Sequence, residues 1–113
     1  MTLKRVMLEM GAGNDLHGGN YTKAALRAVQ DALHHSSLGF SRALGTDIET
    51  MHVHVIIGVQ NPKAVDAQLV RESLPHGQVS VEVKRGGLDV PDDFTGDVAV
   101  VASAAVIVSL DLP

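Results

Sequence analysis

The sequence predicts an α+β fold, a two-layer sandwich in which a four-stranded mixed sheet carries two helices on one face. Residues 78–85 and 97–110 alternate in side-chain character with the period of a strand. Residues 21–34 place apolar side chains three and four positions apart, which is the period of an amphipathic helix. The elements follow one another in the order β-α-β-α-β-β. No linker, internal repeat or low-complexity segment is visible, so residues 1–113 form a single domain.

The first half of the chain begins with a strand, Arg5–Met10, in which apolar and polar side chains alternate. Glycines at 11, 13, 18 and 19 then predict a loop that reaches the next helix. Asn20 is a good N-cap for this helix, which runs from Tyr21 to about His34. Its apolar side includes several alanines, which indicate close packing on a sheet. Beyond it, residues 40–44 allow one more helical turn, ended by Gly45.

The second half contains a β-branched strand at Met51–Val59 and a helix from about Ala64 to Leu74, which follows Pro62. Strict alternation at Gln78–Arg85 predicts a third strand. Residues 86–96 begin with two glycines and contain a proline, and they are expected to form a loop. A long final strand covers residues 97–110.

Both faces of the final strand are apolar or small. Val98, Val100 and the alternate residues through Leu110 lie on one face, and Ala99 through Ile107 lie on the other. Helices cover only one face of a two-layer domain, so the other face needs a partner. At about 25 cal/mol per Å2 of apolar area, leaving it in water costs several kcal/mol. We therefore expect a homo-oligomer that buries this face. In the alternative, the strand bulges near Ala102–Ala104 and residues 86–96 fold over it.

Composition excludes several classes of function. Nine basic and thirteen acidic residues give a net charge of −4, and only three residues are aromatic, so neither a basic stripe nor a stacking platform for nucleic acid is present. Because the chain has no cysteine, it has no disulfide, no thiolate zinc site and no cysteine nucleophile. No apolar run approaches the roughly 20 residues of a membrane helix, and no secretory signal is visible. We expect a cytoplasmic protein that binds neither nucleic acid nor membrane.

The densest group of reactive side chains lies in residues 11–23. A glycine-rich loop that enters a helix N-terminus presents free N–H groups to a carboxylate, phosphate or polarised carbonyl. Asp15 and His17 form a candidate acid/base pair. Lys23 is the third candidate catalytic residue, and the candidate ligand-binding residues near them are Glu9, Gly13, Thr22 and Arg27. The glycine spacing matches neither a P-loop nor a dinucleotide-binding loop, so no cofactor is expected. The alternative is a long turn whose Asp and Asn side chains bond to the backbone.

Two histidines stand at alternate positions of the second strand. His52 and His54 therefore share a face, which is also a spacing for zinc, nickel or copper ligands. Asp15, His17 or Glu9 is the possible third ligand. A half-exposed pair without metal is the expectation, with His54 as a ligand-binding candidate. Glu82 and Lys84 are expected on a solvated strand face.

The motifs Glu9-Met-Gly-Ala-Gly-Asn-Asp15-Leu-His17-Gly and Thr22-Lys23-Ala-Ala-Leu-Arg27 resemble those of a bacterial family of conserved hypothetical proteins of about this length. The resemblance extends through Met51–Val55 and Leu74–Gly77 to Leu88, and this family has no assigned function. The order of elements is also similar to the chorismate-mutase-like sandwich of some bacilli, which includes small trimeric imine deaminases. That resemblance implies a trimer with ligands at subunit clefts.

A more distant resemblance is to the ring-opening amidohydrolases, such as cyanuric acid hydrolase and barbiturase, which use Ser-Lys pairs. Met51–Val59 has no lysine; Ile56 or Ile57 stands where such a strand would carry it. No serine elsewhere is an obvious nucleophile, so the resemblance does not extend to that chemistry.

The hypothesis that follows is a homo-oligomer, a trimer by resemblance, with a small polar or anionic metabolite at a subunit cleft built on residues 11–23. It leaves open whether the protein is an enzyme. One alternative is a non-catalytic assembly module in which this loop is an interface turn, and a further one is a histidine metal site.

Overall fold

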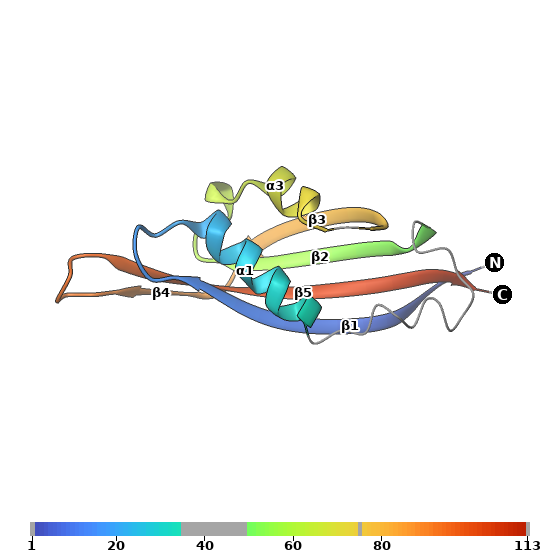
Figure 1. Ribbon diagram of the computed structural model, residues 1–113, viewed down its shortest axis with the longest axis horizontal. Coiled ribbons are helices and arrows are strands. Elements are labelled where there is room, and N and C mark those ends of the chain that lie inside the picture. The colour runs from blue at the N-terminus through green and yellow to red at the C-terminus, as the bar shows by residue number, and fades with distance from the viewer. Residues whose placement is uncertain (1, 35–49, 75, 113) are drawn as a thin grey trace.

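The computed structural model describes residues 2–34, 50–74 and 76–112 (Figure 1). The described elements are β1 (Thr2–Asp15), α1 (Tyr21–His34), β2 (His52–Val59), the 3-10 turn η2 (Pro62–Ala64), α3 (Ala67–Glu72), β3 (Gln78–Arg85), β4 (Leu88–Pro91) and β5 (Val98–Leu112). The predicted helical turn at residues 40–44 lies outside the described residues. Among the described helices, none is long and apolar enough to cross a membrane.

The sheet has five strands, so the prediction of a four-stranded sheet was wrong. Its order is β1-β5-β2-β3, and β4 pairs with the outer end of β5. β5 lies antiparallel to β1, β2 and β4, while β2 and β3 are parallel. The additional strand β4 is only four residues long and lies between two glycines and Asp92, which is too short for alternation to be recognised. Tertiary pairing with Val98–Val101 makes it a strand.

β1 extends farther than its apolar residues indicate. It continues through the predicted loop to Asp15, because Gly11–Asp15 pair with residues 100–104 of β5. The glycines are needed for the approach of α1 rather than for a turn. A Cβ on Gly11 would lie 2.5 Å from the carbonyl oxygen of Ala28, and one on Gly13 would lie 2.5 Å from that of Ala24. The buried alanines of α1 complete this contact, as the sequence predicts.

The core lies between the helices and one face of the sheet. β2 and β5 bury every second residue, including Val55, Ile57, Val106 and Val108. α1 adds its alanines and Val29, and α3 adds Val70. α3 is shorter than the predicted helix, because Asp66 accepts the N–H groups of the first turn and so caps the helix at a position that the periodicity places inside it.

The opposite face of the sheet, here called the open face, carries no described helix. It consists of the side chains that point away from the core, including Leu8, Met10, His54, Ile56, Ser80, Glu82, Val101, Ser103, Ala105 and Ile107. Leu8 and Met10 are exposed there. β5 passes through Ala102–Ala104 without a register shift, and the only shift of the β1–β5 pairing is between Arg5 and Met7. The strand is therefore two-sided, as predicted, and its second face is not covered by residues 88–96.

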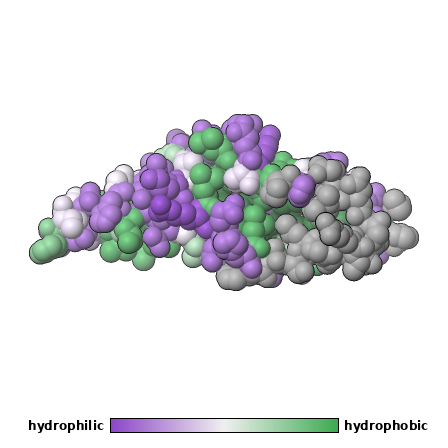
Figure 2. Space-filling view, in the orientation of Figure 1, coloured by the Kyte–Doolittle hydropathy of each residue, from purple (hydrophilic) through white to green (hydrophobic). Residues whose placement is uncertain are grey.

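The molecule is elongated, with extents of 55 × 23 × 19 Å. The β4–β5 hairpin accounts for one end of the long axis and projects beyond the helices (Figure 1). Figure 2 shows a hydrophobic group at the tip of this projection.

Candidate functional site

The structure does not bring the predicted site residues together in one place. Asp15 is the last residue of β1, and the residue is only 6% exposed. Its Oδ2 accepts the N–H of Asn20 at 2.9 Å, and its Oδ1 lies 3.7 Å from Nη1 of Arg27. The Oδ1 of Asn20 in turn accepts the N–H of Lys23 at 3.0 Å, which confirms the predicted N-cap. Through these contacts, Asp15 connects the end of β1 to the start of α1 and so holds the helix against the sheet.

Thr22 is also used within the fold. Its Oγ1 accepts the N–H of Asp66 at 2.9 Å and donates to the carbonyl of Ala64 at 3.4 Å. The hydroxyl therefore links the first turn of α1 to the segment that precedes α3. Gly13 lies under α1, where no side chain fits.

Lys23 and Arg27 line a groove beside the outer edge of β1, here called the basic groove. Its volume is about 450 Å3, and Asn14, Gln30, Asp31 and His34 also line it. Arg27 donates from Nη1 to the carbonyl of Asn14 at 2.6 Å, and Asp31 accepts the N–H of Ala12 at 2.9 Å. Two side chains of α1 therefore satisfy backbone groups on the edge strand, which protects that edge from pairing with another chain.

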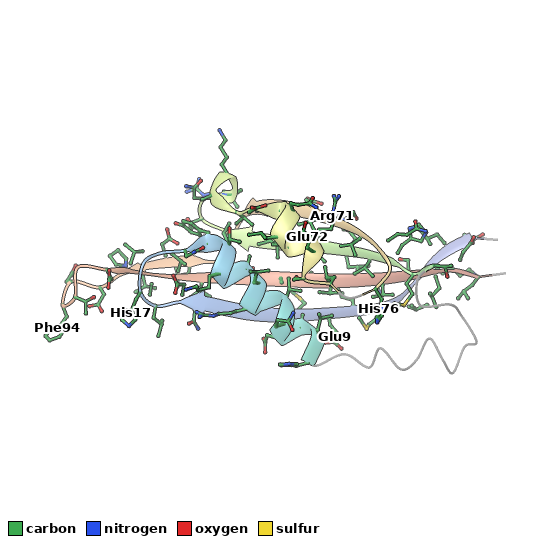
Figure 3. The ribbon with its side chains drawn as sticks, turned by 45° about the horizontal axis from the view of Figure 1, so that its top comes forward. Glu9, His17, Arg71, Glu72, His76 and Phe94 are labelled. Atoms are coloured by element: carbon green, nitrogen blue, oxygen red, sulfur yellow. The ribbon has the colours of Figure 1, made fainter. Side chains whose placement is uncertain are left out.

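Glu9 and His54 lie apart from these residues. Glu9 is paired with Val106 on the helix side of the sheet, beside the C-terminal end of α1 (Figure 3). Asp15 lies six positions farther along the strand, a distance of roughly 20 Å. His54 lies on the open face, with Nδ1 2.7 Å from Oγ of Ser80 and Nε2 3.3 Å from Oε1 of Glu82.

Glu82 and Lys84 lie on the open face and are exposed to solvent, as predicted. Glu82 also forms an ion pair with Lys84, whose Nζ lies 2.9 Å from Oε2 of Glu82. Hydrogen bonds from Lys84 and then His54 lower the pKa of Glu82 below its ordinary value. The described residues hold no group of three or more His, Cys, Asp or Glu side chains arranged for a metal ion.

A second cavity, here called the hairpin cleft, lies where the start of α1 meets the base of the β4–β5 hairpin. Its volume is about 400 Å3, and its lining includes Gly18, Gly19, Tyr21, Asp89, Gly96 and Asp97. Tyr21 donates its hydroxyl to Oδ2 of Asp89. The other oxygen of that carboxylate, Oδ1, is buried and has no hydrogen-bond partner among the described residues.

His17 reaches the border of the same cleft. Its Nδ1 lies 3.5 Å from Oδ2 of Asp97, and the imidazole is 77% exposed at the base of the hairpin (Figure 3). Asp15 lies near this cleft as well. Asp15 on β1 and Asp89 on β4 pair with the same residue of β5, Val100, from its two sides. Of the predicted residues, His17 alone combines access to solvent with a carboxylate partner at this cleft.

Tyr21 and Asp89 were not predicted as site residues. Asp89 lies in the segment expected to be a loop, and Tyr21 was read only as the first helical residue. A possible signal was that Tyr21 is the only tyrosine of a chain with three aromatic residues. The hydrogen bond to Asp89, together with partial burial and the charge of the carboxylate, raises the pKa of Tyr21 above its ordinary value.

Comparisons with known proteins give a family but no activity. The model of a family described as conserved hypothetical proteins, the Lin0512 family, matches residues 5–108. A crystal structure from Nostoc punctiforme, described as an FtsZ-like protein of unknown function, superposes with a TM-score of 0.86. It is 34% identical, and the match covers 99% of both chains. No functionally curated protein matches the chain.

The chorismate-mutase-like and amidohydrolase resemblances receive no confirmation from these matches, whereas the resemblance to a conserved hypothetical family does. The chain belongs to the Lin0512 family of conserved hypothetical proteins.

Proposed function

We propose that the protein is a homo-oligomer that binds a small polar molecule in the hairpin cleft. The observation that carries the proposal is Oδ1 of Asp89, which is buried without a donor among the described residues. A buried polar atom without a partner costs about 1–3 kcal/mol, and more when it is charged. A ligand that supplies an N–H or O–H group to this oxygen removes that cost.

The charge of the cleft favours a neutral or cationic ligand over an anion. Asp89 and Asp97 contribute two carboxylates, and no Lys or Arg is among the described residues that line it. Tyr21 also lines the cleft, and its hydroxyl, which donates to Asp89, has an oxygen that can accept a hydrogen bond from the ligand. The ligand class is therefore a small molecule with amine, amide or hydroxyl donors.

His17 and Asp97 add the groups for acid/base chemistry if the bound molecule reacts. A carboxylate beside one imidazole nitrogen orients the ring, while the other nitrogen stays available for proton transfer. The proposal of binding does not depend on this step.

Self-association is supported by the size and character of the open face. Taking about 3.3 Å per residue along strands about 4.8 Å apart, the open face covers roughly 700–800 Å2. A standard protein interface buries about 800 Å2 on each partner. The exposed Leu8 and Met10 lie within this area beside the half-buried Ile56 and Ile107.

A thermal-shift screen of neutral, cationic and anionic metabolites tests the ligand site. Wild type, Asp89→Asn, His17→Ala and Lys23→Ala are compared, with the exposed Asp93→Asn as matched control. We expect amine or hydroxyl compounds to stabilise wild type, Lys23→Ala and Asp93→Asn. Asp89→Asn should weaken that shift, because it replaces the charged acceptor with a neutral amide.

Loss of the shift in Lys23→Ala, with Asp89→Asn unaffected, would move the ligand to the basic groove and overturn the proposal. Affinity of the hits is then measured by isothermal titration calorimetry, so that a change in stability alone is not mistaken for a change in binding.

A non-catalytic assembly module is the second candidate. It is favoured by the internal use of Asp15, Asn20 and Thr22, whose polar atoms are engaged by the fold itself. In that case no compound shifts the wild type, and substitutions in residues 15–22 change stability or oligomeric mass only.

A further inference from the structure

We infer that the tip of the β4–β5 hairpin of one copy docks into a hollow on the open face of a second copy, with Phe94 as the anchor. This inference rests on the proposed self-association and specifies its contact. Phe94 is 97% exposed and lies at the outermost turn of the hairpin (Figure 3). An aromatic side chain that contributes nothing to its own fold is the usual anchor of an interface.

The turn presents Phe94 in a defined position. Oδ1 of Asp92 accepts the N–H groups of Phe94 at 2.9 Å and Thr95 at 3.4 Å. The backbone closes the turn through Asp92 N–H to the carbonyl of Asp97 and Gly96 N–H to that of Asp92, each at 2.8 Å. An ordered tip loses little conformational entropy on docking, which favours a contact centred on one side chain.

The hollow lies near the middle of the open face. Its volume is about 170 Å3, and its lining includes Met10, Ile56, Gly58, Lys84, Arg85 and Ala105. It exists because two small residues, Gly58 and Ala105, lie between larger neighbours. A cavity of about 150 Å3 with apolar walls accepts a benzene molecule, so this hollow has room for a phenyl ring.

Charge complementarity identifies the occupant as a second copy of this chain. Phe94 follows two carboxylates, Asp92 and Asp93, and the hollow is bordered by Lys84 and Arg85. Lys84 already contacts Glu82 at 2.9 Å, so docking adds a carboxylate to an existing ion pair. Opposite charges around an apolar anchor set the orientation of the contact and its rate of formation.

The tip of the hairpin, residues 92–97 and here called the arm, cannot reach the hollow of its own chain. Val98 is at the base of the tip, and Ala105, beside the hollow, lies seven positions farther along β5, a span of roughly 23 Å. Folding back would break the β4–β5 pairing. The contact is therefore intermolecular and joins two different surfaces, so repeating it about a rotation that closes gives a ring.

The test uses sedimentation velocity on full-length wild type, Phe94→Ala and Ala105→Leu, with Leu69→Ala as matched control. Leu69 is another exposed apolar side chain, on α3 and away from the open face. We expect the wild type and Leu69→Ala to associate with the same affinity. For each of the other two variants, the dissociation constant of self-association should be at least tenfold higher. Melting curves by circular dichroism show whether each variant is folded.

Mixing the two defective variants gives the decisive result. Phe94→Ala retains the hollow and Ala105→Leu retains the arm, so the mixture should form heterodimers although neither variant associates alone. If Phe94→Ala associates like wild type, the arm is not the contact. If Phe94→Ala dissociates but Ala105→Leu does not, the arm docks at another site and the hollow is wrong.

The outcomes separate this inference from the proposed function. A wild type that remains monomeric overturns both self-association and the arm contact, while ligand binding at Asp89 is measured independently. A wild-type oligomer that is insensitive to both substitutions overturns only the arm contact.

Discussion

The hydroxyl of Tyr21, at the first position of α1, donates a hydrogen bond to the carboxylate of Asp89 on β4, 68 residues away in the sequence. This bond connects the helix start to the base of the hairpin and forms one wall of the hairpin cleft. The other oxygen of the Asp89 carboxylate is buried and has no hydrogen-bond partner among the described residues.

Ionisation of Tyr21 should destabilise the protein at high pH. The folded-state pKa of Tyr21 is raised, so the folded protein holds the phenolic proton more tightly than the unfolded chain does. The contribution to stability is complete below about pH 10, the ordinary pKa, and is lost as pH rises through the folded value. Ultraviolet absorbance reports this residue alone, since the chain has one tyrosine and no tryptophan. Asp89→Asn should lower the midpoint; an unchanged midpoint would contradict the hydrogen bond as the cause.

Gly13→Ala should destabilise the fold severely. The added Cβ would lie 2.3 Å from the amide nitrogen of Ala28, a backbone atom that cannot rotate away. Overpacking of this kind costs about 1–3 kcal/mol and often more, because α1 must move off the sheet. Gly96→Ala is the control: no atom lies within 4 Å of its Cβ, so only the strain of a positive φ, about 1 kcal/mol, remains. Equal losses in urea unfolding would show that helix contact is not what requires Gly13.

Asp15→Ala should lower stability while sparing ligand affinity. The substitution removes the acceptor of the Asn20 N–H and leaves a partly buried donor unpaired, which costs about 1–3 kcal/mol. Asp15→Asn retains an acceptor oxygen and should recover part of that loss. Urea unfolding and calorimetry of a cleft ligand separate the two effects. A loss of affinity in the folded Asn variant would instead place Asp15 in the binding machinery.

Acid should loosen the hairpin tip before it unfolds the sheet. Hydrogen bonds from the Thr95 side chain and the Phe94 N–H are the main causes that lower the pKa of Asp92 below its ordinary value. The stabilising effect is present above about pH 3.9 and disappears as pH falls through the lower folded value. Amide hydrogen exchange at Phe94 and Thr95 should therefore gain an additional acid-dependent opening. Asp92→Asn keeps the acceptor and should abolish that dependence, whereas Asp92→Ala should open the tip at every pH.

Much of the architecture is predictable because it depends on local periodicity. The helix from Tyr21 to His34, its Asn20 cap and the alternation of the final strand all follow from neighbouring residues, and the structure contains them. The predictions of a four-stranded sheet and of a loop beginning at Gly11 were wrong for the same reason. Both β4 and the end of β1 are strands because they pair with β5, a contact that local pattern does not record.

The candidate site shows the same division. Composition and motif spacing alone directed attention to residues 11–23 and ruled out nucleotide-binding loops. Tertiary structure decided how those side chains are used: Asp15 and Thr22 within the fold, Lys23 and Arg27 at the basic groove, and His17 beside Asp97. It also added Asp89, whose position at the cleft depends on a strand pairing and a hydrogen bond across 68 residues. The sequence by itself determined the periodicities, the charge and the two-sided final strand, since each depends only on residue type and order. Only the tertiary structure decided which polar groups meet, because such meetings depend on strand register and helix approach.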